Sequence, residues 1–186
     1  RMPLCYGGGI KTVEHYKKII SLGVEKIAIS SAAVENPSLI SAASKIVGSQ
    51  SVVVVLDIKK KKVFNKYEIF INNGLVKTSL EVSKFTKEIE KLGAGEIVIN
   101  SIDRDGTMSG YDHNLVKIIR ESVSLPITIL GGASSLSDMH SIINQFGILG
   151  ISAGSLFVFK GKYRAVLINF PNPKEKDDLF TSKLGE

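Results

Sequence analysis

The chain has 186 residues, of which 44% are hydrophobic and 23% charged, a composition that excludes disorder as the main state. Its apolar runs are far shorter than the roughly 20 residues that span a bilayer, and no signal-like N-terminus is present, so we expect a cytoplasmic protein without a membrane partner. Much of the net charge of +6 lies at residues 59–62 and 160–164, and no aromatic-interleaved basic motif of a nucleic-acid-binding protein accompanies it. This argues against nucleic acid and suits a phosphorylated substrate or an acidic partner subunit.

The first third of the chain alternates short apolar runs with helical patterns. An apolar run at residues 2–6 ends in three glycines, and Thr12 stands at the N-cap position of a helix that ends at Gly23. Residues 26–30 read as the next strand and residues 37–47 as a helix. A continuous β-branched run then ends in Asp57, which is typical of a strand covered on both faces.

The remaining pattern contains an insertion, further strand and helix pairs, and a tail. Residues 59–78, divided by Asn72-Asn73-Gly74, predict an inserted β-hairpin. The strands expected after it are residues 96–102, 126–130 and 148–154, and the helices are residues 79–92, 113–122 and 137–146. Residues 1–170 are thus expected to form the folded part, and residues 171–186 a polar, mobile C-terminal tail.

A stretch near the N-terminus returns in weaker form near the C-terminus. A shift of 123 residues puts Gly8-Gly9 on Gly131-Gly132, and a shift of 124 puts Ser30-Ser31 on Gly154-Ser155. Glycine turns at strand ends that face helix N-termini suit phosphate, because bare amides and the helix dipole both favour an anion. The repeat therefore favours two similar phosphate sites over glycines that only make tight turns.

Polar or small residues end nearly every expected strand, and this decides between two parallel α/β architectures. The strand-ending residues are Ser30, Asp57, Asp103, Gly132 and Ser155. A doubly wound sheet gathers its chemistry at one crevice, whereas a ring of such residues favours a TIM-type (βα)8 barrel. Six strands are counted where a closed barrel has eight.

Several motifs together resemble the cyclase subunit of imidazole glycerol phosphate synthase, a (βα)8 barrel of histidine biosynthesis. They are GGGIKT, ISSAAVENPSLI, VVVVLDIK, GAGEIVINSIDRDGTMSGYD, ILGGA and AGSLFVF, and the match runs from residue 2 to about residue 159. The resemblance implies a lyase whose glutaminase partner makes ammonia. The ammonia passes through the barrel and reacts with a ribulosyl-carboxamide nucleotide that bears two phosphates. The products are imidazole glycerol phosphate and an aminoimidazole carboxamide ribotide.

Relative to that family the sequence starts at the third strand, so we expect an incomplete barrel made of the third to eighth βα units. The resemblance makes Asp57 a catalytic acid/base, and the aspartate that the family pairs with it lies in the first strand. We therefore expect a missing upstream segment, with a split or truncated relative that needs a complementary piece as the alternative, and no cyclase activity from these 186 residues alone. Two open sheet edges would then need a partner.

The remaining site residues also follow from the resemblance. Gly9, Ser30 and Ser31 match one phosphate site. The other phosphate and the ribosyl end are matched by Asp105, Gly106, Gly132, Gly154 and Ser155. Lys26 and Glu96 match the charged ring that gates ammonia entry, while Glu25 and Gln50 match the glutaminase interface. Solvated charges at the barrel bottom are the alternative for this last group. No cofactor is implied, and the single Cys5, expected to be buried, argues against most zinc sites.

Two departures from the family leave the function open. Ser30-Ser31 stands where the family often has Asn-Thr, and Leu130 stands where a serine is usual. The residues GKYRAVLINFP and MPLCYGGGI also look like a paralogous branch, encoded with surface-polysaccharide enzymes, that delivers ammonia for sugar amidination. A non-catalytic scaffold that activates a glutaminase is the third alternative.

Overall fold

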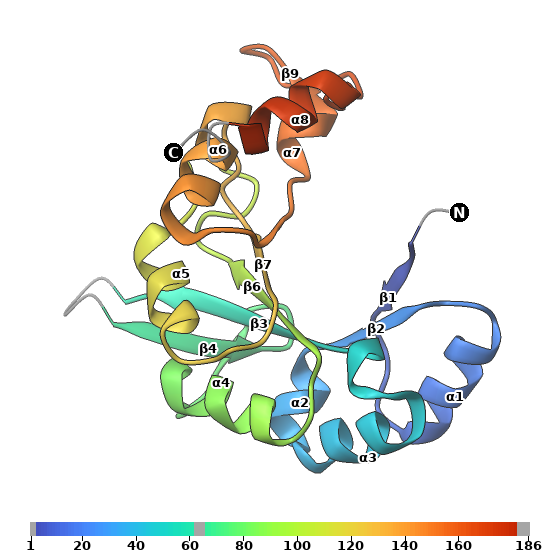
Figure 1. Ribbon diagram of the computed structural model, residues 1–186. Coiled ribbons are helices and arrows are strands. Elements are labelled where there is room, and N and C mark those ends of the chain that lie inside the picture. Colours follow the sequence, from blue (N-terminus) through green and yellow to red (C-terminus); the bar gives the residue numbers. More distant parts are fainter. Residues whose placement is uncertain (1–2, 62–65, 182–186) are drawn as a thin grey trace.

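The computed structural model describes residues 3–61 and 66–181, and its main feature is a curved parallel sheet (Figure 1). The strand order is β1-β2-β3-β6-β7-β8, so each parallel strand lies beside the next one in the sequence. These strands are β1 (Cys5–Gly7), β2 (Lys26–Ile29), β3 (Val52–Lys60), β6 (Glu96–Ser101), β7 (Ile127–Leu130) and β8 (Gly150–Ile151). The order does not reverse as it would in a doubly wound sheet, which confirms the predicted TIM-type α/β barrel architecture.

Helices connect consecutive strands and lie on the convex side of the sheet (Figure 1). They are α1 (Val13–Ser21), α2 (Ser31–Glu35), α3 (Ser38–Val47), α4 (Val82–Lys91), α5 (His113–Arg120) and α6 (Leu136–Phe146), with a 3-10 turn, η1 (Ser49–Ser51), before β3. Three N-caps hold a helix start with a side-chain oxygen, namely Thr12, Asp112 and Ser135. The sequence pattern did not predict α2, a helix of five residues that is too short to show periodicity.

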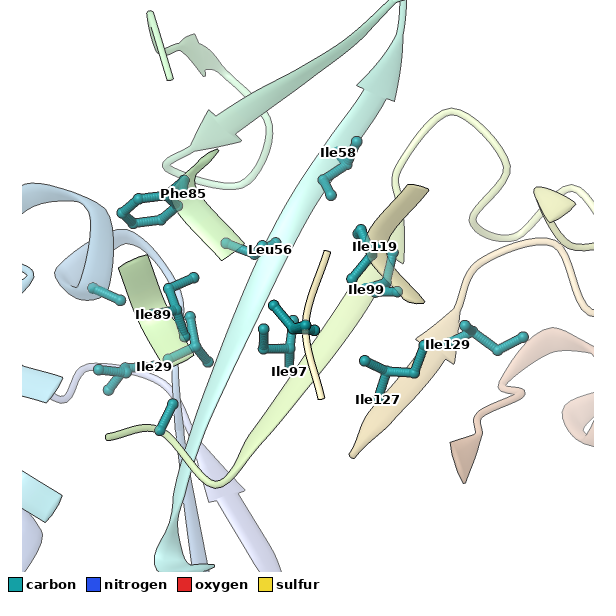
Figure 2. Packing of buried hydrophobic residues seen from close by; sticks show 14 of the residues in the cluster. Ile29, Leu56, Ile58, Phe85, Ile89, Ile97, Ile99, Ile119, Ile127 and Ile129 are labelled. Carbon is teal, nitrogen blue, oxygen red and sulfur yellow. The ribbon is translucent and has the colours of Figure 1, made fainter. Parts of the chain in front are cut away.

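The core lies between the convex face of the sheet and these helices (Figure 2). Leu56 and Ile58 of β3, Ile97 and Ile99 of β6 and Phe85 of α4 are buried in one hydrophobic cluster. Because successive side chains of a strand point to opposite faces, the residues between them face the concave side. Buried packing on one face thus leaves the alternate positions of each strand for chemistry on the other.

The insertion between β3 and α4 forms an antiparallel extension of the sheet. β4 (Tyr67–Ile71) pairs with the second half of β3, and β5 (Val76–Lys77) pairs with β4. The two strands flank Asn72 and Asn73, whose φ angles of 54° and 59° make the turn. Residues 62–65 of the expected hairpin segment lie outside the described residues.

The C-terminal part differs from the sequence prediction. The strand expected over residues 148–154 is reduced to β8, and the chain continues as α7 (Ser155–Val158). A small hairpin of β9 (Phe159–Lys160) and β10 (Ala165–Val166) follows. Within the expected polar tail, α8 (Pro173–Thr181) forms and packs on α6, where Leu179 is partly buried, while residues 182–186 lie outside the described residues. Cys5 was wrongly expected to be buried: it lies on edge strand β1 and is exposed.

Candidate active site

Asp57 lies in β3, opposite Asn100 of β6 in the parallel register. Asn100 Nδ2 donates a hydrogen bond of 2.8 Å to Asp57 Oδ1. Both residues alternate with buried core residues and therefore face the concave side. On the other side of β6, Leu130 of β7 pairs with Asn100, so the three side chains form one row across neighbouring strands. The Asn100 side-chain amide thus orients the Asp57 carboxylate through one of its two oxygens.

A first cleft, of about 540 Å³, opens at the C-terminal ends of β1 and β2. It brings together the predicted phosphate residues Gly9, Ser30 and Ser31, and Lys11 also lines it. The φ angle of 69° at Gly9 needs a glycine, and no atom lies within 4 Å of a Cβ placed there, so the backbone is open to a ligand. The tip of the β4–β5 hairpin completes the wall of the cleft, because the backbone N–H of Asn72 donates a 2.9 Å hydrogen bond to Ser31 Oγ.

A second, smaller cleft lies at the C-terminal ends of β7 and β8. All five residues predicted for the second phosphate and the ribosyl end line it, namely Asp105, Gly106, Gly132, Gly154 and Ser155. A Cβ at Gly154 would meet no atom within 4 Å, whereas one at Gly132 would stand 2.2 Å from the carbonyl oxygen of Gly110. The backbone of Gly154 is thus open to the cleft, whereas Gly132 must be a glycine because the neighbouring loop leaves no room for a side chain.

The loop after β6, residues 102–112, is held by its own arginine rather than offering that arginine to the cleft. Arg104 Nη1 donates to the carbonyl oxygens of Gly110 at 2.8 Å and Tyr111 at 3.3 Å, and Arg104 Nε lies 3.7 Å from Asp112 Oδ2. Tyr67 on β4 donates a 2.8 Å hydrogen bond to Asp112 Oδ1. Burial, and next this hydrogen bond, raise the pKa of Tyr67, so its hydroxyl stays protonated and keeps donating.

The predicted gate and interface residues lie at the opposite edge, where the strands begin. Lys26 Nζ is 2.6 Å from Glu96 Oε2, and Thr128 Oγ1 donates to Glu96 Oε1 at 2.7 Å. Glu25 directly precedes β2, and Gln50 lies in η1 before β3; both are exposed. The structure therefore brings Lys26 and Glu96 together and places Glu25 and Gln50 on the same edge. Thr128 was not predicted, although it stands at a concave-facing position of β7.

Sequence reasoning also missed residues on the ligand side. Asn100 was overlooked, although it is a polar residue at a concave-facing position of β6, which was a usable signal. Lys11 follows the glycine turn by two residues, but a side chain so close to a turn has no direction that the sequence alone defines. Asn72 and Asn73 are typical turn residues in the sequence, and their contribution to the first cleft depends on how the hairpin folds back.

Residues 3–61 and 66–181 contain neither a cluster of metal-ligating side chains nor a candidate membrane span. No group of three or more His, Cys, Asp or Glu side chains in these ranges lies close enough to hold a metal ion. No helix there combines the length and apolar character that crossing a membrane demands.

The sequence matches a family model described as "Histidine biosynthesis protein" over residues 1–164. It is 53% identical over 180 residues to the "Putative imidazole glycerol phosphate synthase subunit HisF" of Leptospira borgpetersenii, which covers 97% of this chain and 71% of that protein. A Vibrio vulnificus protein of the same description, labelled hisF3, is 52% identical over 176 residues, or 95% and 68% of the two chains. The "Imidazole glycerol phosphate synthase subunit HisF" of Clostridium botulinum (strain Okra / Type B1) is 40% identical over 159 residues, or 86% and 63%.

Proposed function

The chain belongs to the histidine biosynthesis protein family, and from this premise we propose that it is the cyclase subunit of imidazole glycerol phosphate synthase. In this reaction ammonia and a ribulosyl-carboxamide nucleotide give imidazole glycerol phosphate and an aminoimidazole carboxamide ribotide. The observation that carries the proposal is the position of Asp57, on a strand between the two clefts that hold the predicted phosphate residues. A substrate with a phosphate at each end would present its middle to this carboxylate.

Each part of the site has a distinct task in this proposal. The open backbone at Gly9 with Ser30 and Ser31 binds one phosphate, and Gly154 with Ser155 binds the other. Asp57 gives or takes a proton as the imidazole ring closes. The amide of Asn100 keeps the Asp57 carboxylate in one orientation, since a hydrogen bond to an ionised oxygen is stronger than one between neutral groups.

We assign the opposite edge of the sheet to a glutaminase subunit that forms a heterodimer with this protein. The support is the Lys26 and Glu96 ion pair, which stands where ammonia would enter the concave side, with Thr128 bonded to the same carboxylate. The exposed Glu25 and Gln50 lie beside it and would contact the partner. Charged and polar groups at such an edge favour association with a complementary partner surface.

The test is an assay of the whole protein with ammonium chloride and the ribulosyl nucleotide, which needs no glutaminase. We expect turnover, and we expect Asp57→Asn to abolish it. Calorimetry should still detect substrate binding to this variant, because the aspartate and asparagine side chains have nearly the same shape and both clefts are unchanged. Asp177→Asn, an exposed site on α8, is the matched control and keeps full activity. Turnover by Asp57→Asn at the rate of the control would contradict the assignment.

One observation favours a second candidate, the delivery of ammonia for sugar amidination. Leu130 neighbours Asn100 and lines the second cleft, so an apolar side chain stands where the histidine-pathway family has a serine hydroxyl. If the wild-type protein fails to turn over the ribulosyl nucleotide, yet stimulates a glutaminase in the presence of a sugar-modifying enzyme, this second function is the correct one. Stimulation of the glutaminase without any product would point to the scaffold alternative.

A further inference from the structure

The hairpin of β9 and β10 extends directly from the second cleft. Gly154 and Ser155 line this cleft, and α7 starts at Ser155 and runs into β9. After the hairpin the chain returns along α7, because the amides of Leu167 and Asn169 donate to the carbonyl oxygens of Val158 at 2.9 Å and Phe157 at 2.8 Å. The hairpin is therefore anchored to the same short segment that forms one wall of the cleft.

Arg164 is the residue of this hairpin that reaches the cleft. Its Nη2 donates a 3.1 Å hydrogen bond to the carbonyl oxygen of Gly106, another lining residue. Its guanidinium lies 4.7 Å from the centre of the Phe159 ring, which limits how far the group can turn. The backbone of Arg164 has a φ of 50°, a strained value for a residue other than glycine, and is held by a 3.0 Å bond from its amide to Gly161 O.

The two clefts differ in charge, and this difference makes the position of Arg164 beside the second cleft important. Lys11 lines the first cleft, whereas none of the described residues that line the second cleft carries a positive charge, and Asp105 adds a negative one. A phosphate monoester carries close to two negative charges at neutral pH and would be repelled by Asp105 unless a cation compensates. A guanidinium has five N–H donors in a planar fork that matches phosphate oxygens, and the bond to Gly106 uses one of them.

We propose that Arg164, presented by the β9–β10 hairpin, binds the phosphate in the second cleft and supplies the positive charge that this cleft otherwise lacks. This inference rests on the proposed function, which places a phosphate beside Gly154 and Ser155. The hairpin thereby supplies to the second site the positive charge that Lys11 gives to the first. The Phe159 ring and the Gly106 carbonyl hold the fork in place before the ligand arrives, which reduces the entropy lost on binding.

The experiment is a titration of the ¹⁵N-labelled whole protein with inorganic phosphate. Amide resonances of Gly106 and Ser155 report the second cleft, and those of Gly9 and Ser31 report the first. The variant is Arg164→Gly, because glycine accepts the positive φ of this residue without strain. Lys162→Gly is the control: it removes the same charge from the same exposed hairpin, so long-range electrostatics change equally in both variants.

We expect Arg164→Gly to weaken phosphate binding at the second cleft by about tenfold or more, the loss of a charge-assisted hydrogen bond, and to leave the first cleft unchanged. Lys162→Gly should change either affinity by less than about twofold. Arg164→Lys should bind with intermediate strength, because it keeps the charge and loses the fork. In the wild type, the Nε–H resonance of Arg164 should shift along with Gly106 and Ser155.

Two results would overturn the inference, and they differ in what else they remove. If Arg164→Gly binds phosphate at the second cleft as tightly as Lys162→Gly does, Arg164 only fastens the hairpin, and the proposed phosphate site stands. If wild-type Gly106 and Ser155 do not respond to phosphate while Gly9 and Ser31 do, the second site of the proposed function fails as well.

Discussion

Replacing Gly132 by alanine tests whether the second cleft depends on a close approach of two backbones. Gly132 has a φ of 99°, and a Cβ there would stand 2.2 Å from Gly110 O and 3.2 Å from Arg104 Cβ. The same backbones are joined by a hydrogen bond of 2.7 Å from the Gly110 amide to Gly132 O. The added methyl group therefore has to push the loop after β6 away from β7.

Two contributions of known size make up the cost. A side chain at this φ costs about 1–3 kcal/mol in backbone strain. Displacing the loop removes the 2.7 Å hydrogen bond, worth about 1 kcal/mol, and loosens the contacts of Arg104 with Gly110. The sum is about 2–4 kcal/mol, a large share of the 5–15 kcal/mol that stabilises a typical domain. For a chain of this size it corresponds to a fall in Tm of roughly 5–15 °C.

Thermal and urea unfolding measure this loss, and Gly154→Ala is the matched control. Gly154 lies in the same cleft, has a φ of −107°, and an added Cβ meets no atom within 4 Å. Its alanine variant should unfold within about 0.5 kcal/mol of the wild type. If Gly132→Ala is also within that margin, the loop after β6 can shift at no cost and the reasoning from close approach is wrong.

Three further predictions concern the loop after β6, the second cleft and helix α4. Tyr67→Phe should cost about 1–3 kcal/mol in urea unfolding, because it removes a donor from the buried Asp112 carboxylate; an unchanged midpoint would contradict this. Gly154→Asp should keep the wild-type Tm and abolish phosphate binding at the second cleft, since the new carboxylate meets open space and repels the anion; unchanged affinity in calorimetry would refute it. Hydrogen bonds from the Ser124 hydroxyl and amide lower the pKa of Glu90, so this pair stabilises the fold above the ordinary pKa of about 4.3 and the stability is lost as the pH falls through the lowered value. Glu90→Gln should therefore flatten the acid side of the curve of urea midpoint against pH, and an equally steep loss would contradict the assignment.

The architecture was accessible from the sequence because it depends on local patterns. The β-branched run of β3 and the small or polar residues at strand ends predicted parallel strands with chemistry at one edge, and the strand order confirms this. Short elements were not accessible in the same way. α2 and α7 have five and four residues, which is too few for a helical period to emerge, and α8 is polar with no buried residue. Its contact with α6 decides its structure more than its own sequence pattern does.

In the candidate site, too, features that depend on local sequence could be predicted, and contacts that depend on the fold could not. Glycine turns are visible in a sequence because a backbone that must take a positive φ needs glycine, and this made Gly9 and Gly132 noticeable in the repeat. The roles of the other cleft residues, such as Asp105, came from the family resemblance. Side chains that meet across strands are not visible in this way. Asn100 contacts Asp57 only because of the register of β3 and β6. Arg164 contacts Gly106, 58 positions away in the sequence, through a hairpin that the sequence pattern did not predict.

The spacing of the two clefts sets the kind of ligand that can use both. The first lies at the ends of β1 and β2 and the second at the ends of β7 and β8, with β3 and β6 between them. Neighbouring strands are about 4.8 Å apart, so the clefts are separated by roughly 20 Å along the curved sheet and by less across its concave side. Under the proposed function, a monophosphate would occupy one cleft and gain nothing from the other. A ligand with a phosphate at each end would bind the second cleft while already held in the first, at a high effective concentration, and its middle would then lie near Asp57. If the proposed function holds, selectivity for a two-phosphate substrate would follow from the order of the strands, and the charges of Lys11 and Arg164 at the two ends would add to it.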